Sequence, residues 1–223
     1  MAFISVFDVI GPNMVGPSSS HTAGAASIAL LTKKMIGEDV KRIKFTLYGS
    51  FAKTYKGHGT DRALVGGILG FETDDERIRD SFKLAKQAGL DFVFESAVTE
   101  DDDIHPNTVD MEVEGVSGRV LYVRGESLGG GKVRLTRING VKVEFTGEFH
   151  ALIVVQRDYP GVVAGVTSVL SNYGVNIAYL RVFRENKGGL AYTIVESDEE
   201  ISENAVAEMK KNPAIEDIML VKR

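Results

Sequence analysis

The sequence predicts an α+β protein of 223 residues with two domains. A mixed, mostly antiparallel α/β domain is expected over residues 1–146, and a ferredoxin-like βαββαβ domain over residues 147–223. Two observations support this division. Segments with helical apolar spacing and segments of alternating apolar and polar residues follow one another along the chain. From Phe149 onward their order is strand, helix, strand, strand, helix, strand, which is typical of a ferredoxin-like unit.

The first half of the N-terminal domain combines helices with isolated strands. An apolar helix that begins after Ser18–Thr22 is expected to end near Ile36, because Gly37 can stop it. The elements expected next are a strand at Ile43–Leu47, a glycine-containing loop at Gly49–Asp61, a helix at Arg62–Leu69, a helix at Asp74–Ala88 capped by Thr73, and a short strand at Phe92–Phe94.

The second half of this domain is expected to be antiparallel sheet. Alternating residues predict strands at Val109–Val113 and Arg119–Arg124, and residues 125–131 are expected to form a loop. The strands Lys132–Ile138 and Val141–Phe145 flank Asn139-Gly140, a strong hairpin signal. Helices are therefore expected on one face of the sheet.

Composition excludes several classes of function. The net charge is -5 and the sequence pI is about 5.5, which argues against binding nucleic acid or an anionic membrane. The N-terminus lacks the basic flank and apolar core of a signal peptide, and no apolar run approaches the roughly 20 residues that a bilayer needs. A cytoplasmic location is the expectation.

The chain contains no cysteine and only four histidines, at positions 21, 58, 105 and 150. Disulfides, a thiolate nucleophile, and iron–sulfur or zinc sites with cysteine ligands of this chain are therefore excluded. No two histidines have His-x-x-x-His spacing, so we expect no metal site.

The first candidate site is Gly16-Pro17-Ser18-Ser19-Ser20-His21-Thr22, just before the first helix. A helix N-terminus leaves backbone N–H groups unpaired and partly positive, and it readily holds a carboxylate or phosphate. His21 adds a ring that titrates near neutral pH. The same residues also fit a well-capped helix whose histidine faces solvent.

Two glycine-containing segments are further candidates. In Gly57-His58-Gly59-Thr60-Asp61 a histidine precedes two residues that can cap the second helix, although taken alone the segment favours a flexible glycine loop with an ordinary cap. In the segment 125–131, Ser127, Gly129 and Gly130 can direct successive backbone N–H groups at an anion, although a plain hairpin loop is the alternative.

The C-terminal domain resembles an ACT domain over its whole length. The resemblance rests on Asp158, Pro160, Gly161, Val162, Val166, Leu170, Asn176 and Ile177. It implies a small regulatory module that pairs side by side as a homodimer and binds an amino acid near Gly161. The expected effector residues are Asp158, Pro160, Gly161, Val162, Asn176 and Ile177. A purely dimerising ACT domain is the alternative.

The four segments at residues 16–22, 57–61, 105–107 and 127–131 together resemble the β chain of iron–sulfur-dependent L-serine dehydratase. The Ser-Ser-Ser-His-Thr run is the most specific part. The resemblance implies conversion of L-serine to pyruvate and ammonia with a [4Fe-4S] cluster. Because this chain has no cysteine, the cluster is expected on a partner α chain, with the active site formed between the two chains.

The resemblance assigns roles to residues within such a site. An iron with an open position can act as a Lewis acid on the serine hydroxyl, so the other half must hold the carboxylate and handle the Cα proton. We expect Gly16, Ser18, Ser19, Ser20 and Thr22 to contact the substrate, and His21 to handle or orient the proton. The next candidates for catalytic residues are His58, Thr60 and Asp61. The third group is Ser127, Gly129 and Gly130, which are expected to donate backbone N–H groups to an anion.

Three other functions remain open from sequence. The chain can be a non-catalytic regulatory subunit that senses L-serine, or a structural dimerisation subunit. It can also be a phosphate-binding enzyme, although it lacks a P-loop and a magnesium-binding carboxylate set. L-Serine is expected as substrate, and as an effector at the ACT domain.

Overall fold

The computed structural model describes residues 12–97 and 103–223. The chain divides into two compact units, residues 1–140 and residues 141–223, and each is described by itself. The expectation about a signal peptide concerns residues that lie outside the described ranges. No helix among the described residues is long and apolar enough to cross a membrane.

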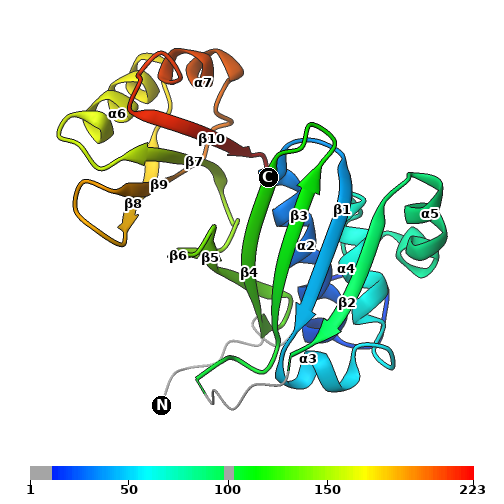
Figure 1. Cartoon of the computed structure of the whole chain (residues 1–223). Helices are drawn as coiled ribbons and strands as arrows, with labels where there is room; N and C mark the ends of the chain where they lie inside the picture. The colour runs from blue at the N-terminus through cyan, green and yellow to red at the C-terminus, as the bar shows by residue number, and fades with distance from the viewer. Residues whose placement is uncertain (1–11, 98–102) are drawn as a thin grey trace, which may run out of the picture. The chain divides into compact units, whose positions relative to one another are not determined.

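The first unit is built on a mixed sheet in which its strands have the order β2-β1-β3-β4-β5 (Figure 1). The strands are β1 (Val40–Leu47), β2 (Asp91–Ser96), β3 (Thr108–Gly115), β4 (Val120–Gly129) and β5 (Lys132–Ile138), and β6 (Val141–Phe145) is the first strand of the second unit. β1 pairs in parallel with β2, whereas the β1–β3, β3–β4 and β4–β5 pairs are antiparallel. The predicted mixed, mostly antiparallel sheet is therefore confirmed.

Helices cover one face of this sheet. The two main helices, α2 (Gly24–Ile36) and α4 (Thr60–Ile68), pack against each other, and α2 also packs on β4 and β5. In Figure 1 they lie behind the strands. The alternation in β1 explains the arrangement, because Ile43, Phe45 and Leu47 are fully buried. Lys44 and Thr46, which point the other way, are only half-buried.

Three local predictions were wrong in this unit. The expected loop after β1 begins with a helix, α3 (Gly49–Thr54), and the expected loop after Arg124 is a continuation of β4 to Gly129. The helix expected at residues 74–88 is a 3₁₀ turn (Glu76–Asp80) followed by α5 (Ser81–Gln87). Its cap is Asp75, whose carboxylate accepts from the Arg77 N–H at 2.9 Å.

The second unit has the predicted βαββαβ order. Its elements are β7 (His150–Arg157), α6 (Val162–Asn172), β8 (Ile177–Arg184), β9 (Leu190–Ser197), α7 (Glu203–Met209) and β10 (Ile215–Val221). The antiparallel sheet has the order β10-β7-β9-β8. Apolar residues of β7 and β9 form a buried core with α6 and α7, including Leu152, Val166, Val195 and Met209.

Truncation of Phe45 tests the core of the first unit. Its ring is fully buried and stacks on Phe94 with a centroid separation of 4.8 Å. Phe45→Ala is expected to lower the free energy of unfolding by about 3–5 kcal/mol, because it leaves a cavity that the sheet and helices cannot fill. Urea unfolding of the full chain measures the loss.

Val93→Ala is the matched control, because Val93 lies on the neighbouring strand β2 and is 47% exposed. It is expected to change stability by less than about 0.5 kcal/mol. Equal losses in the two variants would contradict the assigned core.

Candidate functional site

The serine run forms the first turn of a helix. Ser19–Ala23 is a short π-helix that continues directly into α2, so the helix begins within the run rather than after it. Ser18 is its N-cap, and its Oγ accepts from the His21 N–H at 3.1 Å. The Thr22 and Ala23 N–H groups both donate to the Ser18 carbonyl, at 2.8 and 3.4 Å. Single π turns of this kind occur frequently at functional sites.

Both ring nitrogens of His21 have hydroxyl partners. Ser20 Oγ lies 3.1 Å from Nδ1, with Ser18 Oγ at 3.4 Å, and Ser50 Oγ lies 2.9 Å from Nε2. A neutral imidazole donates at one nitrogen and accepts at the other, and a hydroxyl can serve either role. The ring is therefore held in one orientation, with either tautomer satisfied.

His58 lies beside His21, with 4.8 Å between the ring centroids. The pKa of His21 is lowered, first by burial and second by the neighbouring His58. Both causes disfavour the charged ring. His21 is therefore neutral at neutral pH, the form in which an imidazole accepts a proton.

Thr22 connects the serine run to the segment that carries His58. Its Oγ1 donates to the His58 carbonyl at 3.1 Å. Gly16 lies against the same residue: a Cβ at Gly16 would come within 2.4 Å of Thr22 Cγ2, and its φ is +128°. Only glycine fits there, so Gly16 and Thr22 position the backbone around the site.

Thr60 and Asp61 do not cap α4 as expected. The N-cap is Gly59 in a left-handed conformation, without a side-chain cap. The Thr60 hydroxyl is buried without a hydrogen-bond partner among the described residues. Asp61 accepts from the Arg62 N–H at 2.8 Å, and burial is the main cause that raises its pKa.

Ser127 lies against the start of α2 from the strand β4. A Cβ at Gly24 would come within 2.1 Å of Ser127 Oγ, so the strand and the helix approach closely here. The Ser127 N–H donates to the Asn107 carbonyl at 3.0 Å and is not available to an anion as expected, although its buried Oγ has no partner within the described ranges. Gly129 pairs with Lys132, and Gly130 follows in the hairpin turn.

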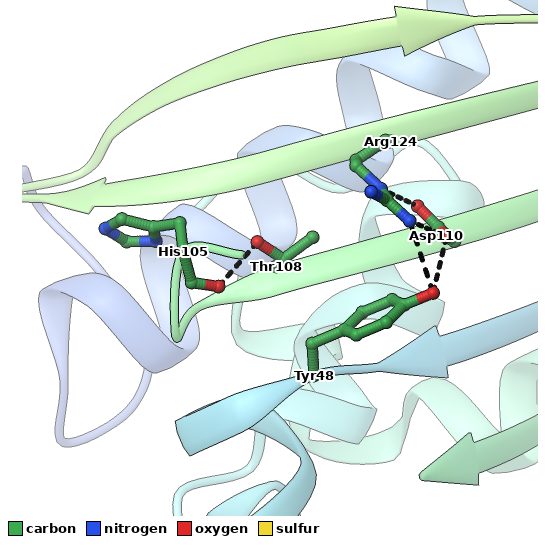
Figure 2. Close-up of polar contacts among 5 residues, drawn as sticks. All are labelled: Tyr48, His105, Thr108, Asp110 and Arg124. Atoms are coloured by element: carbon green, nitrogen blue, oxygen red, sulfur yellow. Dashed lines mark hydrogen bonds and ion pairs between the residues drawn. The ribbon is translucent and has the colours of Figure 1, made fainter. Parts of the chain in front are cut away.

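The segment His105-Pro106-Asn107 connects this strand to α3. The Phe51 N–H donates to the Pro106 carbonyl at 3.2 Å, and Thr108 Oγ1 donates to the His105 carbonyl at 2.6 Å, as Figure 2 shows. The segments at residues 105–107 and 127–131 therefore meet through backbone contacts, and α3 lies beside them.

Two residues of this site were missed from the sequence. Ser50 contacts His21 Nε2, and the Phe51 ring meets the His21 ring edge-on at 5.4 Å between centroids. Both belong to α3, where a loop was expected. A serine a few residues after a strand is too common a feature to have distinguished Ser50.

Of the expected effector residues, Asp158, Pro160, Gly161 and Val162 lie around the start of α6 in the second unit. Asn176 and Ile177 follow the end of α6, at the start of β8, so the structure does not bring all six residues together. Asp158 Oδ2 accepts from Arg184 Nη1 at 2.5 Å and from the Gly188 N–H at 3.1 Å. The Gly188 bond, followed by Arg184, lowers the pKa of Asp158. Asp158 thus holds the turn between β8 and β9.

The remaining effector candidates divide into exposed and buried positions. Gly161 is the left-handed N-cap of α6 and offers no side-chain cap. Pro160 is exposed, whereas Val162 is buried and Ile177 packs against the core. The Asn176 N–H donates to Glu199 Oε2 at 3.0 Å.

A resident metal or cluster does not fit the described residues. They contain no group of three or more histidine, cysteine, aspartate and glutamate side chains that could hold a metal ion. The full sequence contains no cysteine.

Comparisons with known proteins identify the family. The family model described as serine dehydratase beta chain matches residues 5–137, and the ACT domain model matches residues 150–214. The chain therefore belongs to the serine dehydratase beta chain family, with a C-terminal ACT domain.

Curated relatives support this assignment along nearly the full length. The "Probable L-serine dehydratase, beta chain" of Bacillus subtilis is 43% identical over 96% of this chain and 96% of that protein. The "L-serine dehydratase, beta chain" of Peptoniphilus asaccharolyticus is 44% identical over 92% of this chain and 91% of that protein. An "L-serine dehydratase" of Mycobacterium bovis is 32% identical over 61% of this chain but only 34% of that protein.

Removal of the His58 ring tests the electrostatics of the site. In His58→Gln the pKa of His21 is expected to rise toward the ordinary value of about 6.5, because one of the two causes that lower it is lost. Burial remains, so the rise is partial. NMR titration of the His21 ring protons measures the pKa, with His150→Gln as the control because His150 belongs to the other unit. An unchanged His21 pKa in His58→Gln would contradict the arrangement.

Proposed function

We propose that this chain is the β subunit of an L-serine ammonia-lyase, which converts L-serine to pyruvate and ammonia together with an α chain. The observation that carries the proposal is the neutral His21 ring, held at both nitrogens by hydroxyls at a helix N-terminus. A base poised in this way suits removal of a proton from Cα.

The need for a companion chain is supported by two observations. The relatives from B. subtilis and P. asaccharolyticus are each named as a beta chain, and the longer M. bovis protein matches this chain over about a third of its length. We propose that the remaining length of that protein supplies what a separate α chain provides here. We propose that the [4Fe-4S] cluster belongs to this α chain, since the sequence has no cysteine and residues 12–97 and 103–223 hold no metal-binding group of histidine and carboxylate side chains.

The helix N-terminus is proposed to hold the substrate carboxylate. Ser18 and Ser20 already contact His21, whereas the half-buried Ser19 hydroxyl has no partner among the described residues. The His21, Thr22 and Ala23 N–H groups already donate to Ser18, so the Ser19 hydroxyl and the Ser19 and Ser20 N–H groups are the donors proposed for the carboxylate, where the helix dipole favours negative charge.

In the proposed reaction His21 takes the Cα proton as the β-hydroxyl leaves, so that L-serine loses one water and becomes 2-aminoacrylate. Its imine tautomer then adds water and releases ammonia, which leaves pyruvate. Ser50 and Ser20 position the ring during the first step, and burial, followed by His58, lowers the pKa of His21 so that the ring is neutral beforehand. Thr60 and Asp61 are proposed to line the same site from the start of α4.

Substitution of His21 tests the proposed base. In the complex with the α chain, His21→Ala is expected to lower kcat by about 10²- to 10⁴-fold, the range over which general bases contribute. His150→Ala, in the other unit, is expected to retain normal turnover. Steady-state assay of pyruvate formation measures both variants, and size-exclusion chromatography verifies assembly.

A His21→Ala complex that assembles and turns over normally would contradict the catalytic role. If the isolated chain also bound L-serine tightly by calorimetry, the alternative of a serine-sensing regulatory subunit would replace it. Pyruvate formation by the isolated, iron-free chain would contradict the requirement for a partner.

We also propose that L-serine acts as an effector at the ACT domain, which pairs with a second copy. The α6 N-terminus at Gly161 has no side-chain cap, so its first N–H groups can receive an amino-acid carboxylate. The effector can shift activity only by its differential affinity for the two states.

A glutamate in the first turn of α6 tests this regulation. Ala164→Glu places a carboxylate near the same N–H groups, where it competes with an effector without disturbing the helix. The Hill coefficient for L-serine is expected to fall toward 1 in this variant. Ala207→Glu is the matched control, because Ala207 is equally exposed on α7. Identical saturation curves for both variants and the unmodified complex would contradict the effector site.

A further inference from the structure

The open face of the first unit's sheet carries two arginines directly opposite each other. Arg124 on β4 pairs in register with Arg137 on β5. Both are half-buried, while their neighbours in sequence, Val123 and Ile138, are buried on the helix-covered face. Like charges placed directly opposite on adjacent strands destabilise a sheet unless something compensates them.

The protein compensates only one of these two charges. Asp110 on β3 accepts from Arg124 Nε and Nη2, both at 2.6 Å, and Tyr48 donates to Asp110 at 2.8 Å (Figure 2). Arg124 Nη2 also lies 3.2 Å from the Tyr48 hydroxyl. The Asp110 carboxylate and Tyr48 hydroxyl raise the pKa of Arg124 further. Both oxygens of Asp110 are therefore committed to Arg124 and Tyr48.

Arg137 has neither a hydrogen bond nor an ion pair within the described ranges. It lines a cavity of about 360 Å³ together with Asp110, Glu112, Tyr122, Arg124 and Asn139. Glu112 is the other carboxylate there, and it lies 3.6 Å from Lys44 Nζ, on the side away from β5. The cavity is within the size range of small-molecule sites.

We propose that this cavity is a binding site for a small oxyanion, a carboxylate or a phosphate, held between Arg137 and the remaining edge of Arg124. A guanidinium binds such groups through two parallel N–H donors. Arg124 is held rigidly by Asp110 and Tyr48, so little ordering is required on that side. The anion supplies the charge that the cross-strand arginine pair lacks. This site lies on the opposite face of the sheet from α2, and it does not depend on the proposed catalytic role.

Calorimetric titration of the full chain tests the proposal with two probes, succinate and inorganic phosphate, in chloride buffer of matched ionic strength. At least one probe is expected to bind, and Arg137→Gln is expected to weaken that binding by about tenfold or more. The probe that binds distinguishes a carboxylate ligand from a phosphate ligand.

Arg42→Gln is the matched control, since Arg42 is an exposed arginine of β1 outside the cavity. It is expected to bind the probe like the unmodified chain. Without any probe, Arg137→Gln is expected to melt at the same temperature as the unmodified chain or higher, because the like-charge pair is removed. Loss of binding then cannot be attributed to unfolding.

Three results would overturn the proposal. These are no binding of either probe beyond chloride, unchanged binding in Arg137→Gln, and equal weakening in Arg42→Gln, which would indicate non-specific attraction to positive charge.

Discussion

The contact on which the candidate site depends is the clamp of His21 between hydroxyls from two separate helical segments. Ser20 belongs to the π-helical turn before α2, and Ser50 belongs to α3 after β1. An imidazole held at both nitrogens cannot rotate without losing a hydrogen bond, so its direction is fixed by the tertiary structure. Burial, followed by the nearby His58, lowers the pKa of His21 and keeps the ring neutral. The same packing of the ring therefore sets both its orientation and its protonation state.

The two faces of the first unit's sheet carry different kinds of side chain. On the covered face, apolar residues of β1 meet the helices and place the serine run beside Ser127. On the other face, alternation directs charged residues such as Arg124 and Arg137 outward. The hydroxyls and the His21 ring therefore lie beside the helices, and paired ions lie on the face nearer to solvent. This difference follows from the cost of burying an uncompensated charge.

Secondary structure was predicted well where the local sequence has a clear apolar periodicity or a specific turn motif. The βαββαβ order of the C-terminal unit followed from apolar periodicity, and the Asn139-Gly140 turn followed from its type I′ preference. The weak predictions lay where glycine and polar residues are mixed. Gly49–Thr54 became a helix, and Gly125–Gly129 remained strand because its neighbours β3 and β5 supply hydrogen-bond partners that the local sequence does not indicate. Thr60 was expected to cap α4 but is buried. Its burial depends on tertiary packing, which the local sequence does not indicate either.

The sequence by itself determined the family, the order of elements in the ACT domain, the exclusion of cysteine ligands, and the serine run with its histidine, since these depend on residue type and short spacing. Only the tertiary structure decided that Ser50 meets His21, that Ser127 packs against Gly24 with its N–H already used, and that Arg124 faces Arg137. The physical reason is that these pairs are separated along the chain by between 13 and 103 residues. Strand register and helix packing bring them together, and neither can be read from residues close in sequence.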